Sequence, residues 1–230
     1  MSHSSLINLT YNLNTLKTLK TIIALFLFCV ISTNANSQTQ AFQEWAQRTT
    51  GPNVSIFNAV GAVDANGNAV VTRQTRVGFA NHIVTVKYNT AGVQQWIVID
   101  EAGLGAAIVM DNAGNVYITG NGTSGFVTIK YNSAGVEQWK SVLGSAAGGA
   151  IALDAAGNVY VTGVSIPGIV TIKYNSAGVQ QWATVYAFSG PGGASGIALD
   201  ASNNVYITGS TNDDYTTIKY NNSGVQQWVS

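Results

Sequence analysis

The chain has 230 residues, of which 46% are apolar and only 9% are charged, and its ten basic side chains balance its ten acidic ones. A disordered chain would carry more charge and fewer Val, Ile, Tyr and Trp residues. Binding to a nucleic-acid backbone needs an excess of basic residues. The sequence therefore predicts one globular domain, or two small ones, with no nucleic-acid partner.

Residues 1–37 have the pattern of a cleaved secretory signal peptide. Two lysines precede an apolar run at residues 22–31, and small polar residues follow it. This run is shorter than the about 20 residues that a membrane span needs. We expect residues 1–37 to be removed, which leaves a secreted or surface-located chain without a membrane span. The single cysteine, Cys29, lies in the removed segment. A buried helix of the domain is the alternative interpretation of this run.

The rest of the chain is an internal repeat of four copies, at about residues 50–99, 100–142, 143–186 and 187–230. The same residue types recur from copy to copy, 43 to 47 residues apart. The recurring positions are a turn aspartate (Asp64, Asp111, Asp154, Asp200) and a tryptophan (Trp96, Trp139, Trp182, Trp228). We interpret both series as structural.

Each copy contains four short runs rich in β-branched and aromatic residues, separated by Gly, Asn and Asp. In the third copy these predict strands a to d at 151–154, 158–163, 169–175 and 179–186. Two connections recur almost unchanged. In Asp-x-x-Gly-Asn the aspartate bonds back to the chain, and Asn-x-x-Gly-Val has the form of a three-residue hairpin loop.

A repeated four-stranded antiparallel unit of this length predicts an all-β propeller of four blades. A parallel β-helix is the alternative, although its turns recur on shorter periods. A leading d-like strand at residues 44–49 leaves three arrangements open. They are a closed four-bladed ring, a fragment of a larger ring, and half of an eight-bladed homodimer.

Three segments resemble the SBBP β-propeller repeat of secreted bacterial proteins. They are D-A-A-G-N-V-Y-V-T-G (154–163), T-I-K-Y-N-S-A-G-V-Q-Q-W (171–182) and S-T-N-D-D-Y-T-T-I-K-Y-N (210–221). The resemblance extends over about residues 44–230 and implies an extracellular propeller with no particular reaction. The first copy departs most, because Arg73 stands where the others have Gly and Ala69 aligns with their strand b tyrosine.

The residues that usually perform catalysis are scarce. After removal of the signal peptide, the chain keeps one histidine, His82, and no cysteine, and it has no G-x-S-x-G motif. We therefore predict no catalytic residues, no metal site and no cofactor. Calcium binding by the turn aspartates is the alternative to turn capping, although their spacing lacks the alternating oxygen donors of a calcium loop.

A lysine also recurs on strand c of each copy. If Asn175 pairs with Val179, Lys173 lies opposite Gln181, with its stem over the sheet and its head on an amide or water. A ring of lysines that binds anions is the alternative. For the tryptophans we predict a core role that fills the wide outer part of each blade, with an aromatic ladder for ligand stacking as the alternative.

The variable connections are the expected location of specificity, because loops on a rigid scaffold commonly bind ligands. They are the b-to-c loops (73–82, 120–126, 163–168, 209–215) and the d-to-a loops, which share one rim. The predicted contact residues are Arg73, Arg76, Phe126, Phe188, Asp213, Asp214 and Tyr215. We expect a non-catalytic module that binds a protein or glycan there. The alternatives are a lyase or hydrolase that uses loop carboxylates on an extracellular polymer, and a structural spacer of a larger surface protein.

Overall fold

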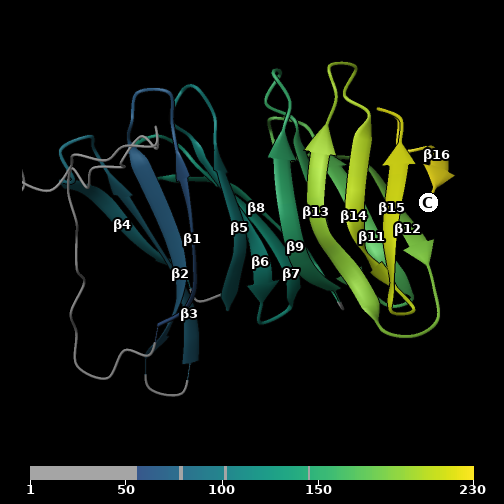
Figure 1. Ribbon diagram of the computed structural model, residues 1–230. Helices are drawn as coiled ribbons and strands as arrows, with labels where there is room; N and C mark the ends of the chain where they lie inside the picture. The colour runs from purple at the N-terminus through teal and green to yellow at the C-terminus, as the bar shows by residue number, and fades with distance from the viewer. Residues whose placement is uncertain (1–55, 78–79, 101–102, 145) are drawn as a thin grey trace, which may run out of the picture. The chain divides into compact units, whose positions relative to one another are not determined.

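The computed structural model describes residues 56–77, 80–100, 103–144 and 146–230 (Figure 1). The chain divides into two units, residues 1–43 and 44–230, and all described residues belong to the second unit. The expected signal peptide and the expected strand at 44–49 lie outside the described residues. Within the described part, no helix is long and apolar enough to cross a membrane.

The described residues form sixteen strands in four sheets. The first sheet comprises β1 (Ile56–Val63), β2 (Ala69–Val77), β3 (Ala80–Tyr88) and β4 (Gln94–Asp100). The second comprises β5 (Leu104–Met110), β6 (Val116–Gly122), β7 (Gly125–Tyr131) and β8 (Glu137–Leu143). The third comprises β9 (Ala146–Leu153), β10 (Val159–Ser165), β11 (Gly168–Tyr174) and β12 (Gln180–Ala187). The fourth comprises β13 (Gly192–Leu199), β14 (Val205–Thr211), β15 (Asp214–Tyr220) and β16 (Gln226–Val229).

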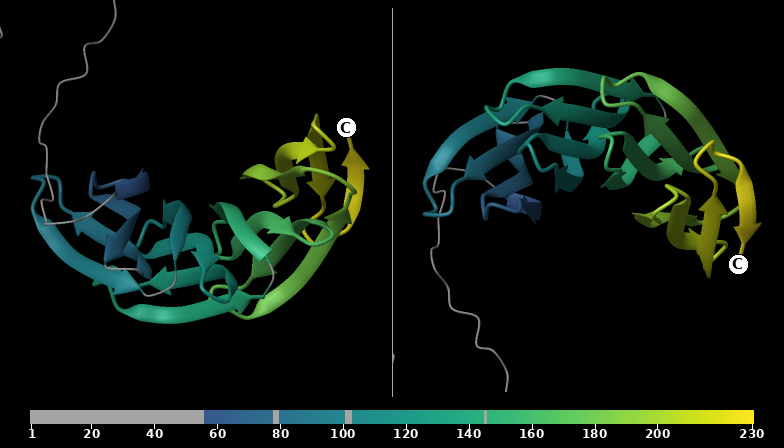
Figure 2. Two further views of the ribbon diagram at one scale, coloured as in Figure 1. Left: turned by 90° about the horizontal axis from the view of Figure 1, so that it is seen from below. Right: turned by 90° about the horizontal axis from the view of Figure 1, so that it is seen from above.

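Every sheet is an antiparallel meander whose strands pair in chain order, as expected for propeller blades. Consecutive sheets pack against each other, chiefly through their first strands: β1 contacts β5, β5 contacts β9 and β9 contacts β13. Figure 2 shows the sheets following one another in chain order, with the fourth strands β4, β8 and β12 on the outer side. The prediction of an all-β propeller fold with four four-stranded antiparallel blades is confirmed.

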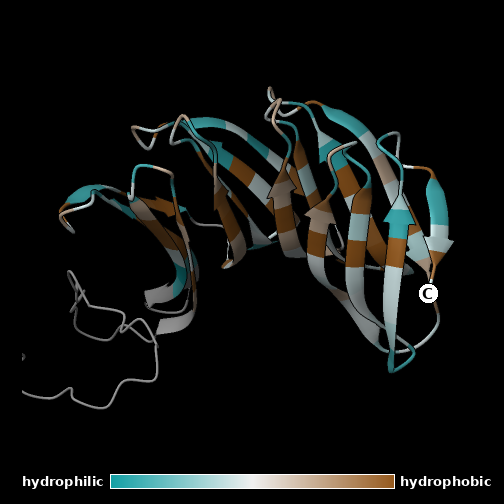
Figure 3. Cartoon of the chain, turned by 45° about the horizontal axis from the view of Figure 1, so that its top comes forward, coloured by the Kyte–Doolittle hydropathy of each residue, from teal (hydrophilic) through white to brown (hydrophobic). Residues whose placement is uncertain are grey.

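The cores lie between consecutive sheets, because the middle strands are covered on the faces against which neighbouring sheets pack. In β10, Val159, Tyr160 and Val161 are successive residues and all are fully buried. Figure 3 shows hydrophobic residues along the middle of these strands. When a sheet is buried on both faces, the sequences of its strands are continuously apolar instead of alternating between apolar and polar residues. This burial explains the low content of charged residues.

Glycines in the first strands allow neighbouring sheets to approach each other closely. A Cβ atom on Gly149 of β9 would lie 2.8 Å from the carbonyl oxygen of Ala194 in β13. On Gly105 of β5 it would lie 3.0 Å from Oγ1 of Thr72. The Gly- and Ala-rich sequences before the predicted strand a therefore belong to that strand, so β9 begins at Ala146 and not at residue 151.

The b-to-c connections are shorter than the sequence predicted. The pairs Gly122↔Gly125 and Thr211↔Asp214 leave only two residues between their strands. Most of the residues assigned to loops therefore extend strands b and c. Because these tips differ in sequence from copy to copy, no repeated turn motif marked the ends of the strands.

The predicted register between strands c and d is wrong by one residue. Lys173 lies opposite Trp182, because a β-bulge between Lys173 and Tyr174 shifts the pairing. Such a bulge accompanies a three-residue hairpin loop that ends with a left-handed glycine, here Gly178 with φ 80°. The alignment of the first copy also needs correction. Val70, and not Ala69, lies opposite Lys87 and takes the place of the strand b tyrosine.

Candidate functional site

The turn aspartates cap the loop between the first two strands of each sheet. Oδ1 of Asp154 accepts hydrogen bonds from the backbone N–H groups of Ala156 (3.0 Å) and Asn158 (2.9 Å). Its Oδ2 accepts from Nδ2 of Asn158 (2.7 Å) and the hydroxyl of Tyr160 (3.2 Å). Asp64, Asp111 and Asp200 make the same bonds to the backbone and to asparagine. Turn capping thus uses both carboxylate oxygens.

The tryptophans bind across the boundary between sheets. The indole N–H groups of the first three donate to the carbonyl of the residue after the asparagine in the Asn-x-x-Gly-Val turn of the next sheet. The pairs are Trp96 to Ser133 (3.0 Å), Trp139 to Ser176 (3.2 Å) and Trp182 to Asn222 (2.9 Å). Trp96, Trp139 and Trp182 are half-buried at this boundary, on the fourth strands of their sheets.

The recurring lysines reach the same turns, and Lys87 also reaches the aspartate turn beside it. Lys87 donates to the carbonyls of Gly114 (3.0 Å) and Ser133 (3.5 Å), and Lys130 donates to the carbonyl of Ser176 (3.1 Å). Lys173 donates to Oδ1 of Asn222. We call the tryptophan and lysine of one sheet, together with the turn that they bind in the next, a latch. Three latches join the four sheets.

Within each of the last three sheets, a tyrosine, a lysine and a tryptophan form a row across neighbouring strands. In the third sheet, Lys173 lies 5.0 Å from the ring centroid of Tyr160, and the rings of Tyr160 and Trp182 meet edge to face at 6.2 Å. This contact between a cation and an aromatic face stabilises the ammonium group without an acidic partner. The recurring lysines therefore make contacts within and between the sheets.

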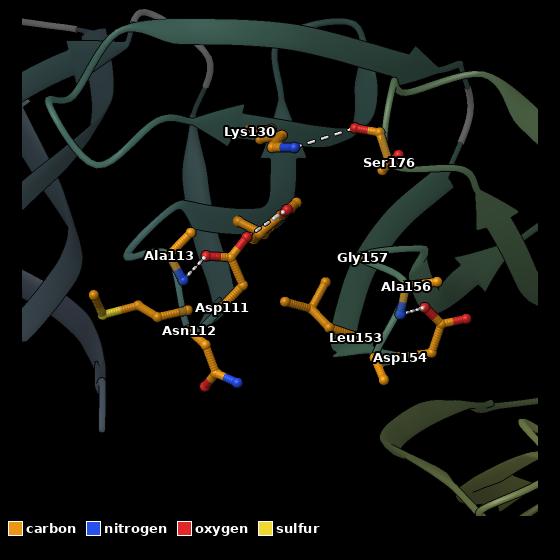
Figure 4. Close-up of a pocket in the computed structure, with 12 residues that line it drawn as sticks. Asp111, Asn112, Ala113, Lys130, Leu153, Asp154, Ala156, Gly157 and Ser176 are labelled. Atoms are coloured by element: carbon orange, nitrogen blue, oxygen red, sulfur yellow. Dashed lines mark hydrogen bonds between the residues drawn. The ribbon is translucent and has the colours of Figure 1, made fainter. Parts of the chain in front are cut away.

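A cavity of about 500 Å³ lies between the second and third sheets, at the rim of the repeated turns. Figure 4 shows Asp111 on one side and Leu153 and Asp154 on the other, with the hydrogen bond from Lys130 to Ser176 above them. Burial opposes ionisation of Asp111, but hydrogen bonds from Asn115 and Tyr117 outweigh it, so the pKa of Asp111 lies below its usual value. Both carboxylates already accept the hydrogen bonds of their own turns.

The opposite rim carries the two-residue hairpins and exposes large apolar side chains. Ile166, at the tip between β10 and β11, is 92% exposed, and Tyr215, beside the tip between β14 and β15, is 99% exposed. Ile166 borders a hollow of about 540 Å³ shared with the second sheet, and another of about 260 Å³ beside Phe188. The backbone N–H of Asn212 donates to the carbonyl of Pro191 (2.9 Å), which joins the fourth-sheet hairpin to the loop at 188–191. We call this surface the hairpin rim.

The predicted contact residues fall into three groups. Phe188, Asp213, Asp214 and Tyr215 lie on the hairpin rim, and Asp213 has a left-handed φ of 70° in its tip. Arg73 and Arg76 lie on β2, where Arg73 is half-buried and pairs with Val84. Phe126 is only 2% exposed and packs into the core with Tyr117 and Val161. As a ligand contact Phe126 is therefore wrong, because β7 begins one residue before it.

The sequence analysis did not single out Ile166, because its only distinguishing feature is its place before a proline in a variable tip.

His82 lies on β3 opposite Thr75, and its Nδ1 is buried without a hydrogen-bond partner among the described residues. Across the described ranges, no three His, Cys or carboxylate side chains are placed together to hold a metal ion.

Comparisons with known proteins give one family match. Residues 182–216 match the model of the SBBP β-propeller repeat, and the match runs from Trp182 on β12 to Thr216 on β15. The chain has no match among curated proteins.

Several solved structures share a general likeness to the chain. A gluconolactonase from Xanthomonas campestris has 12% identity and a TM-score of 0.42 over 64% of this chain and 52% of its own. HIRA has 13% identity and a TM-score of 0.47 over 79% and 57%. A GH62 hydrolase in complex with xylotriose has 10% identity and a TM-score of 0.39 over 79% and 71%. The match thus spans little more than half the length of the gluconolactonase and HIRA chains. Residues 182–216 contain an SBBP β-propeller repeat, as the sequence resemblance implied.

Proposed function

We propose that this protein is a secreted or surface-located, non-catalytic module that binds an extracellular protein or glycan through its hairpin rim. The observation that carries the proposal is the exposure of Ile166 (92%) and Tyr215 (99%) on short hairpins next to hollows. Ile166 and Phe188 line one hollow, and exposed apolar groups that share a hollow mark interaction sites more often than single ones do. The signal-peptide pattern at residues 1–37 supports secretion.

The chemistry of the hairpin rim suits a ligand with both apolar and hydroxyl groups. Tyr215 offers an aromatic face, and Asp213 and Asp214, beside it, are exposed acceptors. Phe188 and the two-residue tip at Ile166 add apolar surface around the smaller hollow. The repeated-turn rim offers less, because its carboxylates and asparagines are engaged in their own turns.

A binding screen on immobilised extracellular polysaccharides and surface proteins tests this function, with the chain lacking residues 1–37. We expect at least one ligand to be retained, and we expect Ile166→Ser and Tyr215→Ser to weaken its retention at an unchanged melting temperature. Asn112→Ala is the matched control, because Asn112 is exposed on the repeated-turn rim. Retention that Asn112→Ala weakens and the hairpin variants leave unchanged would contradict the proposal.

The same polysaccharides separate binding from catalysis. An enzyme that acts through loop carboxylates would release new chain ends, and Asp213→Asn with Asp214→Asn would stop that release. The binding proposal expects no release. A chain that retains no ligand and releases no product would contradict both functions and support a structural spacer instead.

A further inference from the structure

Three short tips follow one another along the hairpin rim, one from each of the last three sheets. They lie at residues 123–124, 166–167 and 212–213, between the second and third strands of their sheets. The larger hollow is lined by the first two tips. The smaller hollow is lined by the second tip and the loop at 188–191, to which the third tip is hydrogen-bonded. The tips and the two hollows therefore form one continuous surface, which we call the tip strip.

Hydrogen bonds fix the walls of the smaller hollow. The backbone N–H of Phe188 donates to the carbonyl of Pro167 (3.1 Å), and the hydroxyl of Ser165 donates to the carbonyl of Gly168 (3.1 Å). The apolar side chain of Ile166 stands between the two hollows, because it lines both. A ligand of the tip strip therefore requires little ordering of the protein when it binds.

The lining of both hollows is apolar or carries hydroxyl groups. It consists of Gly, Ala, Val, Ile, Pro, Phe, Ser and Thr, and no charged or amide side chain of the described residues takes part. A sugar held there would lack partners for several of its hydroxyl groups, and a buried polar group without a partner opposes binding. An aliphatic or aromatic side chain leaves no such group unpaired and gains from the burial of its apolar surface.

The third tip adds negative charge at one end of the tip strip. Asp213 and Asp214 are exposed, and their carboxylates make no hydrogen bond or ion pair with any described residue. No lysine or arginine lines the neighbouring hollow. Two carboxylates without a cation are complementary to a basic group of a partner, and such complementarity contributes chiefly specificity and rate of association.

We propose that the tip strip binds an exposed protein segment in which apolar side chains are followed by a lysine or arginine. Apolar side chains of the segment enter the hollows on either side of Ile166, and the basic group lies against Asp213 and Asp214. This inference rests on the proposed function and narrows the ligand of the hairpin rim from a protein or glycan to a protein.

Selection from a random peptide library displayed on phage, against the immobilised chain lacking residues 1–37, tests the proposal. We expect the enriched peptides to combine apolar residues with a lysine or arginine. A synthetic copy of an enriched peptide should bind Ile166→Ser about tenfold more weakly than the wild type, as expected for an apolar group at a pocket. The melting temperature of the variant shows whether its fold is intact.

Charge reversal tests the acidic end of the tip strip. Asp213→Asn with Asp214→Lys keeps a residue that tolerates the left-handed φ of position 213. It should weaken binding of the basic peptide about fivefold and strengthen binding of the same peptide with glutamate in place of its basic residue. Glu137→Lys is the matched control and should change neither, because Glu137 is exposed at the start of β8, beside a turn of the opposite rim.

A selection that enriches no peptide would overturn the proposal, as would peptides that Ile166→Ser and the charge reversal bind unchanged. If a polysaccharide is retained instead and Ile166→Ser weakens its retention, the proposal fails while the hairpin rim stands as the binding surface. If peptides, polysaccharides and surface proteins all fail to bind, the proposed function fails as well.

Discussion

The third and fourth sheets carry the same row of tyrosine, lysine and tryptophan, but within the described residues another sheet packs over this row only in the third. Trp182 donates to the carbonyl of Asn222 and packs on Gly224, whereas Trp228 is 43% exposed. The same residues therefore join two sheets in one place and are partly exposed in the other. A repeated motif acquires its role from its neighbour as much as from its own sequence.

The largest expected difference between the two sheets comes from deletion of the tryptophan rings. Trp182→Ala should lower the free energy of unfolding by about 3 kcal/mol, the lower end for a large core residue, because Trp182 is half-buried. Trp228→Ala should lower it by less than about 1 kcal/mol, since little packs on it. Urea unfolding of both variants measures the difference, and equal losses would contradict the contrast.

A pair of glycines separates the packing of the indole from backbone strain. Gly178 and Gly157 have φ values of 80° and 76°, but a Cβ atom would lie 2.6 Å from the Trp139 ring at Gly178 and 3.6 Å from Ser176 at Gly157. Gly157→Ala should cost about 1 kcal/mol from strain alone. Gly178→Ala should cost about 2 kcal/mol more, because the latch must also shift. Thermal unfolding of both variants checks this order.

Much of this arrangement follows from the sequence. The turns at Asp154 and Asn175 and the strands between them are predicted from turn chemistry and strand propensity. The latches are not, because Trp182 binds a backbone carbonyl 40 residues away, and a carbonyl has no signature in a sequence. The burial of Phe126 could not be predicted either, because the two-residue tips vary in sequence and do not mark where β7 begins.

The turn aspartates give a smaller effect that depends on pH. The pKa of Asp111 is lower in the folded chain than its usual value, so its ionised form favours folding. This contribution is complete above the unfolded pKa, about 3.9, and is lost as the pH falls through the folded value. Asp111→Asn should cost about 1 kcal/mol at neutral pH and make the unfolding free energy less sensitive to acid. An unchanged acid sensitivity would contradict the capping role.

The smallest effect on stability is expected at the hairpin rim. Ile166 is 92% exposed, so Ile166→Ser should change the free energy of unfolding by less than about 0.5 kcal/mol. A larger loss in urea unfolding would show that the tip supports the fold, which would remove it as a free binding surface.

The most direct test of the latch is the removal of a single N–H donor from each of the two sheets. Trp182→Phe and Trp228→Phe keep an aromatic ring, and among the residues that the structure describes only the first loses a hydrogen bond. Urea unfolding of both variants is measured at a concentration where the chain is monomeric. We expect Trp182→Phe to lower the free energy of unfolding by about 1 kcal/mol more than Trp228→Phe does. Equal losses in the two variants would contradict the claim that the tryptophans hold the sheets together through the turn carbonyls.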